Sequence, residues 1–248
     1  TLGIVLRNAS LTKLLTRDDD GKNALHFVPE CTEAFLSQLL ETHPEFIKEC
    51  DDYGLTILHS WIKMGKLWPF KYMIKSDDIK PSWKSSFIHL LRKKDREKSN
   101  PLHLAASSSS KDMVDIVTLL LDASHRTSIF RASRCEKDSE NNTPLGIAVS
   151  KRHEQLALLF LSMDDDSLRR GEANLALKAI EHECNEVVKF LLDWTAKCGN
   201  EKFLRSDECN VLHRAWKSTE ENGKLIVEKW PELINDRDKD GQTPLQTA

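Results

Sequence analysis

The sequence predicts an all-α repeat fold, a solenoid of about seven helix-turn-helix units that forms a single domain over residues 1–248. Three observations predict it: a helix-start motif recurs along the chain, amphipathic stretches follow several copies of it, and a single unit is too small to bury its own apolar face. A partial unit in residues 1–16 precedes the first complete motif. The motifs start near residues 23, 56, 100, 143, 174, 210 and 243.

The helix-start motif is clearest at Thr143, where the sequence reads TPLGIA. A threonine at this place can cap the helix by accepting a hydrogen bond from a first-turn amide, and Pro144 then occupies the helical position at which a missing amide hydrogen costs nothing. The same order returns as NPLHLA at Asn100 and TPLQTA at Thr243, and in weaker form at the other starts. Each start therefore predicts the first helix of a unit.

The second helix of a unit is predicted by apolar residues that recur at steps of three and four. The clearest examples are DIVTLLLD from Asp115 and EVVKFLLD from Glu186, followed by QLALLFL from Gln155. Such faces need neighbours to cover them, so we expect contacts between adjacent units to supply most of the stability.

A motif of the form T-P-L-H-x-A with a period near 33 residues resembles the ankyrin repeat, in which a turn and two antiparallel helices form each unit. The family places glycine two residues before the cap, where the backbone takes a positive φ angle. This chain has Gly21, Gly54 and Gly241 there, with Asn141 as the next best choice, while Lys98, Glu172 and Glu208 depart from the pattern.

Four histidines occupy the fourth place of the motif: His26, His59, His103 and His213. Because each belongs to a different unit, the pattern argues against a shared metal or acid-base site, and the resemblance implies that they hydrogen-bond neighbouring backbone. The sequence shows no complete zinc-ligand set, phosphate-binding glycine loop or nucleophile motif. We therefore predict no enzyme activity, no metal and no cofactor.

Two long intervals between motifs hold insertions, residues 76–99 and 123–140. The first carries a basic cluster that includes Arg92, Lys93 and Lys94. One interpretation is an extended loop that contacts a partner through these three residues, because insertions in repeat proteins often emerge on the binding face. The other is a solvated turn with a short amphipathic helix, FIHLLRKK, packed on the stack.

Two segments share a longer phrase, HPEFIKECDDYGLT from His43 and WPELINDRDKDGQT from Trp230. The phrase resembles plant ankyrin proteins that follow their repeats with a membrane-spanning region and act in defence and cell-death control. This resemblance implies a cytosolic regulatory or sensor domain of a larger membrane protein, attached to the membrane only through segments outside this chain.

Composition limits the partners. The formal net charge of −3 gives no general electrostatic basis for binding nucleic acid. No stretch has the length of a transmembrane helix, the start lacks the features of a signal peptide, and the six cysteines are scattered, so we predict a cytoplasmic chain with free thiols.

The leading hypothesis is a monomeric stack that binds a protein partner through its concave face and inter-repeat loops, as the resemblance implies. The alternative is the regulatory or sensor domain described above. When the motif is placed on this chain, the positions expected to be exposed on that face are Tyr53, Leu55, Ser60, Lys178, Arg214, Lys239 and Gln242.

Overall fold

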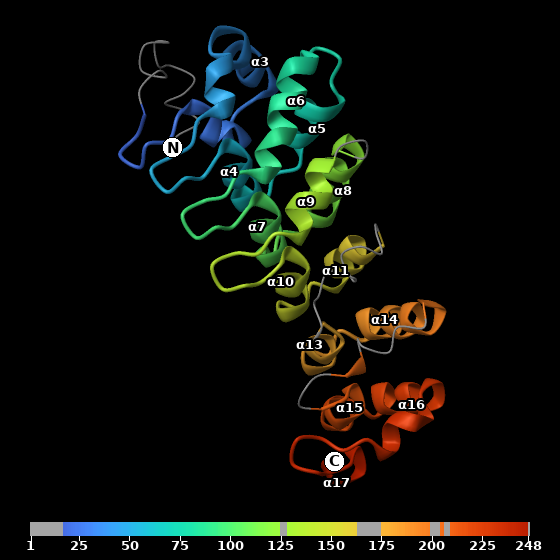
Figure 1. The fold of residues 1–248 in the computed structure, drawn as a ribbon. Coiled ribbons are helices and arrows are strands. Elements are labelled where there is room, and N and C mark those ends of the chain that lie inside the picture. Colours follow the sequence, from blue (N-terminus) through green and yellow to red (C-terminus); the bar gives the residue numbers. More distant parts are fainter. Residues whose placement is uncertain (1–16, 125–127, 163–174, 199–203, 206–208, 248) are drawn as a thin grey trace. The chain divides into compact units, whose positions relative to one another are not determined.

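Helical hairpins follow one another along the chain in the computed structural model, which describes residues 17–124, 128–162, 175–198, 204–205 and 209–247 (Figure 1). Within these ranges there is no β-strand, only isolated bridges between Cys50 and Thr56 and between Arg205 and Asn210. The chain divides into two compact units, Thr1–Pro144 and Leu145–Ala248, called unit 1 and unit 2 below.

Unit 1 is built from helical hairpins with additional short helices between them. Its described elements are η1 (Ala24–Glu30), α3 (Glu33–Thr42), η2 (Pro44–Lys48), α4 (Ile57–Met64), α5 (Trp68–Lys75), α6 (Pro81–His89), η3 (Leu90–Arg92), α7 (Pro101–Ser107), α8 (Met113–Ser124) and α9 (Ser128–Cys135). The helices marked η are 3₁₀ helices.

Unit 2 repeats the hairpin arrangement with fewer additions. Its described elements are α10, which starts at the unit boundary (Pro144–Ser150), α11 (Glu154–Leu161), α13 (Leu175–Glu181), α14 (Asn185–Cys198), α15 (Val211–Ser218), α16 (Glu220–Lys229), η5 (Pro231–Asn235) and α17 (Pro244–Thr247). No helix among the described residues is long and apolar enough to cross a membrane.

The predicted helix starts agree with the observed ones. Helices begin directly after the six described cap positions, Asn23, Thr56, Asn100, Thr143, Asn210 and Thr243. The remaining start at Asn174 and the partial unit 1–16 lie outside the described residues. The three predicted second helices are also confirmed as α8, α11 and α14.

The two insertions contain packed helices, as the second interpretation expected. In residues 76–99 the chain forms α6 and η3, whose apolar side chains are buried. These side chains are Trp83, Phe87, Ile88, Leu90 and Leu91. Residues 123–140 contain α9, and Figure 1 shows α6 and α9 as additional helices beside the hairpins of unit 1.

An aromatic cluster lies in the core of unit 1. Trp61 on α4 is fully buried, and its ring lies 5.9 Å from that of Phe70 on α5 and 5.3 Å from that of Phe87 on α6. The Trp61 indole N–H donates to the carbonyl of Leu25 at 2.6 Å. The inserted helix α6 therefore contributes Phe87 to the core of unit 1.

Trp61 occupies the place at which the motif has a small alanine, and the sequence alone would predict that so large a side chain distorts the second hairpin. That expectation is wrong, since α4 is an α-helix that ends at Gly65 with a left-handed φ of 62°. The irregular element is its neighbour η1, a 3₁₀ helix that contains Pro29. The Leu25 carbonyl that accepts from Trp61 belongs to η1.

Candidate protein-interaction surface

Five of the described loops that precede a helix start are closed by an aspartate, called the turn aspartate below. In the loop 51–55, Oδ1 of Asp51 accepts hydrogen bonds from the amides of Tyr53 and Leu55 at 2.9 and 2.8 Å. Side-chain acceptance of amides two and four residues on fixes a tight turn without help from a partner molecule. The same two bonds recur at Asp18, Asp95, Asp138 and Asp238.

The fourth residue of each of these loops has a positive φ angle. Glycine fills this place at Gly21, Gly54 and Gly241, with φ between 76° and 79°. Asn141 and Lys98 adopt the same conformation, with φ of 66° and 59°. Lys98 departs from the glycine pattern in sequence but not in backbone geometry.

Replacing Gly54 with alanine is expected to destabilise the chain by about 1–2 kcal/mol, because a side chain is strained at positive φ. The new Cβ would also lie 3.3 Å from the Cα of Asp95. Gly241→Ala is the matched control, since its φ is 76° but nothing lies within 4 Å of its Cβ. Urea unfolding should show a larger loss of stability for Gly54→Ala than for Gly241→Ala. Equal losses would mean that the loop containing Asp95 does not lie against Gly54.

Adjacent loops of unit 1 are joined by a ladder of backbone hydrogen bonds. The amide after each turn aspartate donates to a carbonyl of the preceding loop: Asp52 to Asp20 at 2.9 Å, Arg96 to Tyr53 at 3.1 Å and Ser139 to Glu97 at 3.0 Å. Figure 1 shows the loops before α4, α7 and α10 projecting on one side of unit 1. The loop tips thus form an ordered row, called the tip row below.

The motif histidines tie each first helix to the next loop. Nδ1 of His59 accepts from the Thr56 amide at 3.1 Å, and its Nε2 lies 3.2 Å from the Ser99 carbonyl. An accepting Nδ1 and a donating Nε2 define the neutral imidazole tautomer. His26, His103 and His213 make equivalent contacts with Leu55, Asn142 and Gln242.

Burial disfavours the charged form of His26, His59 and His103. It lowers the pKa of His59 from 6.5 to about 4, partly opposed by the Ser99 carbonyl. It also lowers the pKa values of His26 and His103, partly opposed by hydrogen bonds to backbone. A neutral ring bonded on both sides confirms the structural role predicted for these residues.

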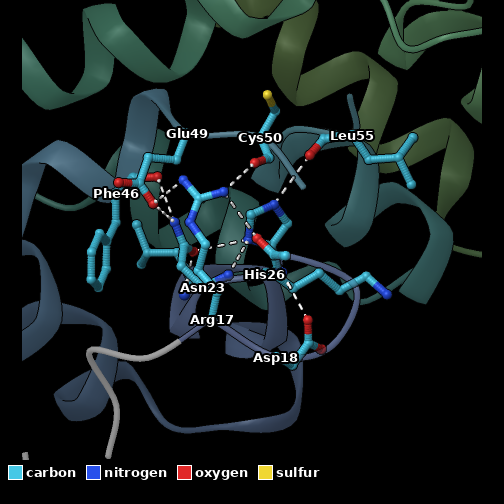
Figure 2. A network of polar contacts seen from close by, with 11 residues as sticks. Arg17, Asp18, Asn23, His26, Phe46, Glu49, Cys50 and Leu55 are labelled. Carbon is cyan, nitrogen blue, oxygen red and sulfur yellow. Dashed lines mark hydrogen bonds and ion pairs between the residues drawn. The ribbon is translucent and has the colours of Figure 1, made fainter. Parts of the chain in front are cut away.

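A polar clamp joins the first two loops (Figure 2). The Arg17 guanidinium donates to the Cys50 carbonyl at 3.1 Å and pairs with Glu49 at 3.3 Å. Glu49 also accepts from the Asn23 side-chain amide at 2.8 Å, and the same amide lies 3.3 Å from the Phe46 carbonyl. The cap residue Asn23 therefore also binds the turn that follows its own hairpin.

Unit 2 contains an equivalent clamp. Arg205 pairs with Asp236 at 2.9 Å, and the Asn210 side-chain amide donates to Asp236 at 3.1 Å and to the Leu233 carbonyl at 2.9 Å. Asparagine is thus used at these caps for two purposes, because its oxygen caps the helix while its nitrogen reaches the following segment. Threonine at Thr56 cannot make the second contact.

Replacing Asn100 with aspartate is expected to cost about 2 kcal/mol near neutral pH, because a buried carboxylate oxygen would face a carbonyl. The Asn100 side-chain nitrogen now donates to the Ser133 carbonyl at 2.6 Å, and the residue is fully buried. Asn100→Thr, which keeps a capping oxygen, should cost less. Thermal unfolding that ranked the two variants in the reverse order would contradict this assignment.

The residues predicted to lie on the binding surface differ in their solvent exposure. Tyr53, Arg214, Lys239 and Gln242 are exposed, and Lys178 on α13 is half-buried. Arg214 on α15 pairs with Glu181 on α13 at 3.2 Å. The sequence located Tyr53 on a tip, where it is 53% exposed.

The expectation of exposure is wrong for Leu55 and Ser60, which are 7% and 6% exposed. Leu55 ends its loop, with its amide held by Asp51 and its carbonyl bound by His26, so its side chain is directed into the hairpin stack. Ser60 is buried on α4, which packs between η1 and α7. Neither side chain is available to a partner.

The basic residues of the first insertion follow the buried part of η3. Arg92, Lys93 and Lys94 are all exposed. Lys94 pairs with Glu136 at 3.1 Å, so it also links η3 to the segment after α9.

Among the described residues no group of His, Cys, Asp or Glu has the arrangement of a metal site.

Sequence analysis did not identify the turn aspartates as a general feature. The signal is an aspartate five residues before the cap, which is present in five of the loops. The phrase itself consists of residues with structural roles. Its proline starts η2 or η5, its aspartate closes the loop and its glycine takes the positive φ.

Capped hairpins joined by aspartate-closed loops define a helical repeat protein, and comparisons identify its type. Residues 83–170 match the family model described as ankyrin repeats in three copies. Residues 83–170 therefore contain ankyrin repeats, and the fold of the chain is the ankyrin fold. No curated protein matches this sequence.

Solved structures with a similar fold include two ankyrin repeat domains. That of Bcl-3, described as a unique member of the IkappaB protein family, has a TM-score of 0.59 and 18% identity over 93% of this chain and 95% of its own. That of human ASB11 has a TM-score of 0.55 and 15% identity, with 91% of each chain covered. At these identities the likeness concerns the fold.

Proposed function

We propose that the chain is a non-catalytic protein-binding module, and that the tip row of unit 1 is a main contact surface. Ankyrin repeats are generally protein-protein interaction modules, which is the first support for this proposal. The observation that carries it is the order of the tips, which are closed by turn aspartates and joined by hydrogen bonds of 2.9–3.1 Å. A surface that is ordered before binding loses little conformational entropy when a partner docks.

Tyr53 is the strongest single candidate for a contact on this surface. Its ring is 53% exposed, and the Arg96 guanidinium lies 5.9 Å from the ring centre. Tyrosine and arginine are among the residue types that most often dominate binding energy at protein interfaces. In unit 2 we propose Lys178, Arg214, Lys239 and Gln242 as contacts, in accordance with their positions in the motif.

The basic residues Arg92, Lys93 and Lys94 are proposed as a second contact that favours an acidic partner. All three residues are exposed, with Lys94 in an ion pair with Glu136. Opposite charge on a partner would mainly increase the rate of association. This contribution should weaken as ionic strength rises.

Affinity purification from native tissue, with quantitative mass spectrometry, tests these proposals together. The baits are the wild type, Tyr53→Ala and a variant in which Arg92, Lys93 and Lys94 become glutamate. A matched control reverses three other exposed lysines, Lys66, Lys71 and Lys75. All baits must melt at the wild-type temperature within about 2 °C, a shift equivalent to less than 1 kcal/mol for a chain of this size.

We expect Tyr53→Ala to reduce one set of co-purifying proteins and the control to leave it unchanged. Loss caused only by the triple reversal would assign binding to the basic insertion. If all four baits retained the same proteins, both contact assignments would be rejected.

A further inference from the structure

One residue of the loops breaks a charge pattern that the others follow. The residue two places after each turn aspartate, called the tip position here, is acidic in four of the five described loops of this kind. The tip positions are Asp20, Tyr53, Glu97, Glu140 and Asp240. Tyr53 is the one tip residue among them without a negative charge.

The fold does not require tyrosine at this place. The loop uses only the backbone of Tyr53, whose amide donates to Asp51 and whose carbonyl accepts from Arg96. The side chain is 53% exposed and does not contribute to the core. The other tyrosine of the chain, Tyr72 on α5, is half-buried.

The ladder places a cation beside the exceptional tip. Each tip carbonyl in this ladder accepts a hydrogen bond from an amide of the next loop. The donor is Asp52 for Asp20, Ser139 for Glu97 and Arg96 for Tyr53. Arg96 is the one basic residue in these three bonds of unit 1. Its guanidinium carbon lies over the Tyr53 ring, 5.9 Å from the ring centre, so the two side chains are neighbours.

We propose that Tyr53 is a phosphorylation site, and that its phosphate would pair with Arg96. A tyrosine kinase would transfer the γ-phosphoryl group of ATP to Oη of Tyr53. The bond from the γ-phosphorus to the bridging oxygen breaks as the bond to Oη forms, ADP leaves and the phenol proton is released. The product carries a negative charge at the tip position, like the other loops, and offers Arg96 strong acceptor oxygens.

Modification at this place would change the proposed contact surface. It would convert an exposed aromatic tip into an anionic one and add an ion pair between loops 51–55 and 95–99. The inference depends on the loop geometry and holds whatever partner the surface binds.

The test treats the purified chain with ATP and a broad-specificity tyrosine kinase, and maps the phosphate by peptide mass spectrometry. Tyr53→Phe and Tyr72→Phe are the two variants. We expect one phosphate on the wild type and on Tyr72→Phe, and none on Tyr53→Phe. Phosphate on Tyr72 with Tyr53 unmodified, or no phosphate when a peptide standard is modified, would overturn the proposal.

A second measurement tests the pairing with Arg96. Phosphorylation should raise the melting temperature of the wild type by about 2 °C at low salt, since a new ion pair would join two loops. Arg96→Gln should remove this gain, and salt of about 1 M should reduce it in the wild type by screening. An equal gain in Arg96→Gln would refute the pairing.

Discussion

Replacing Trp61 with alanine is expected to lower the free energy of unfolding by about 3–5 kcal/mol, the largest effect of any single substitution considered for this chain. The side chain is fully buried against Phe70 and Phe87, which come from α5 and α6. Its removal leaves a cavity where three helices meet, and it also leaves the Leu25 carbonyl without its donor. Guanidinium unfolding followed by circular dichroism would measure the loss.

Trp68→Ala is the matched control. Trp68 is half-buried, and its indole N–H lies 3.3 Å from the Pro29 carbonyl, so it resembles Trp61 in bonding but not in packing. We expect a loss of about 1–2 kcal/mol for this variant. Equal losses for the two variants would show that the aromatic cluster does not stabilise unit 1 as described.

The helix starts could be predicted because their signals are local. A cap residue, a proline at the first helical position and a leucine determine a helix start within four residues, whatever the rest of the chain does. Asn100 and Thr143 illustrate this. The motif histidines were predictable for the same reason, since the partner of Nδ1 lies three residues away.

The burial of individual side chains depended on neighbours that are distant in sequence. Leu55 and Ser60 were expected at the surface, but the segments that cover them come from other hairpins. Likewise, the alanine-to-tryptophan change at Trp61 looked like a local distortion until α6 was seen to supply Phe87. A periodic pattern identifies an apolar face but does not identify the element that covers it.

The candidate surface was predictable only in part. Tyr53 was placed correctly on an exposed tip, because its position follows from the motif. The ladder that orders the tips depends on backbone bonds between residues more than thirty positions apart, such as Arg96 and Tyr53. No side-chain pattern in one loop encodes such a bond, so the contact between Arg96 and Tyr53 required the structure.

The second large effect is a loss of stability as the pH falls from about 6.5 to about 4. The pKa of His59 is about 4 in the folded chain and 6.5 as its ordinary value, so the unfolded chain binds a proton at a higher pH than the folded chain. The stabilisation is therefore complete above about pH 6.5 and is lost as the pH falls toward about 4. A difference of this size corresponds to about 3 kcal/mol, and the lowered pKa values of His26 and His103 act in the same direction.

His59→Gln separates this histidine from the other titrating groups. Glutamine can keep the cap, as Gln246 does when its side-chain oxygen accepts from the Thr243 amide at 2.9 Å. It cannot take up a proton in this range, and it is expected to lose the contact with the Ser99 carbonyl. The variant should therefore be less stable than the wild type at pH 7 but should lose less stability on acidification.

Urea unfolding at pH 7.0, 6.0, 5.0 and 4.5 would measure the two slopes, with the exposed His89 replaced by glutamine as the control. Asp51 and Asp95 raise the pKa of His59 and Lys63 lowers it, but burial outweighs all three because the ring has no bulk water around it. Protonation would place a hydrogen on Nδ1, which now accepts from the Thr56 amide, so acid should open the cap of α4 and its link to the next loop together. If the free energy of unfolding falls equally steeply with pH in His59→Gln and in the wild type, protonation of His59 is not the cause of the acid destabilisation.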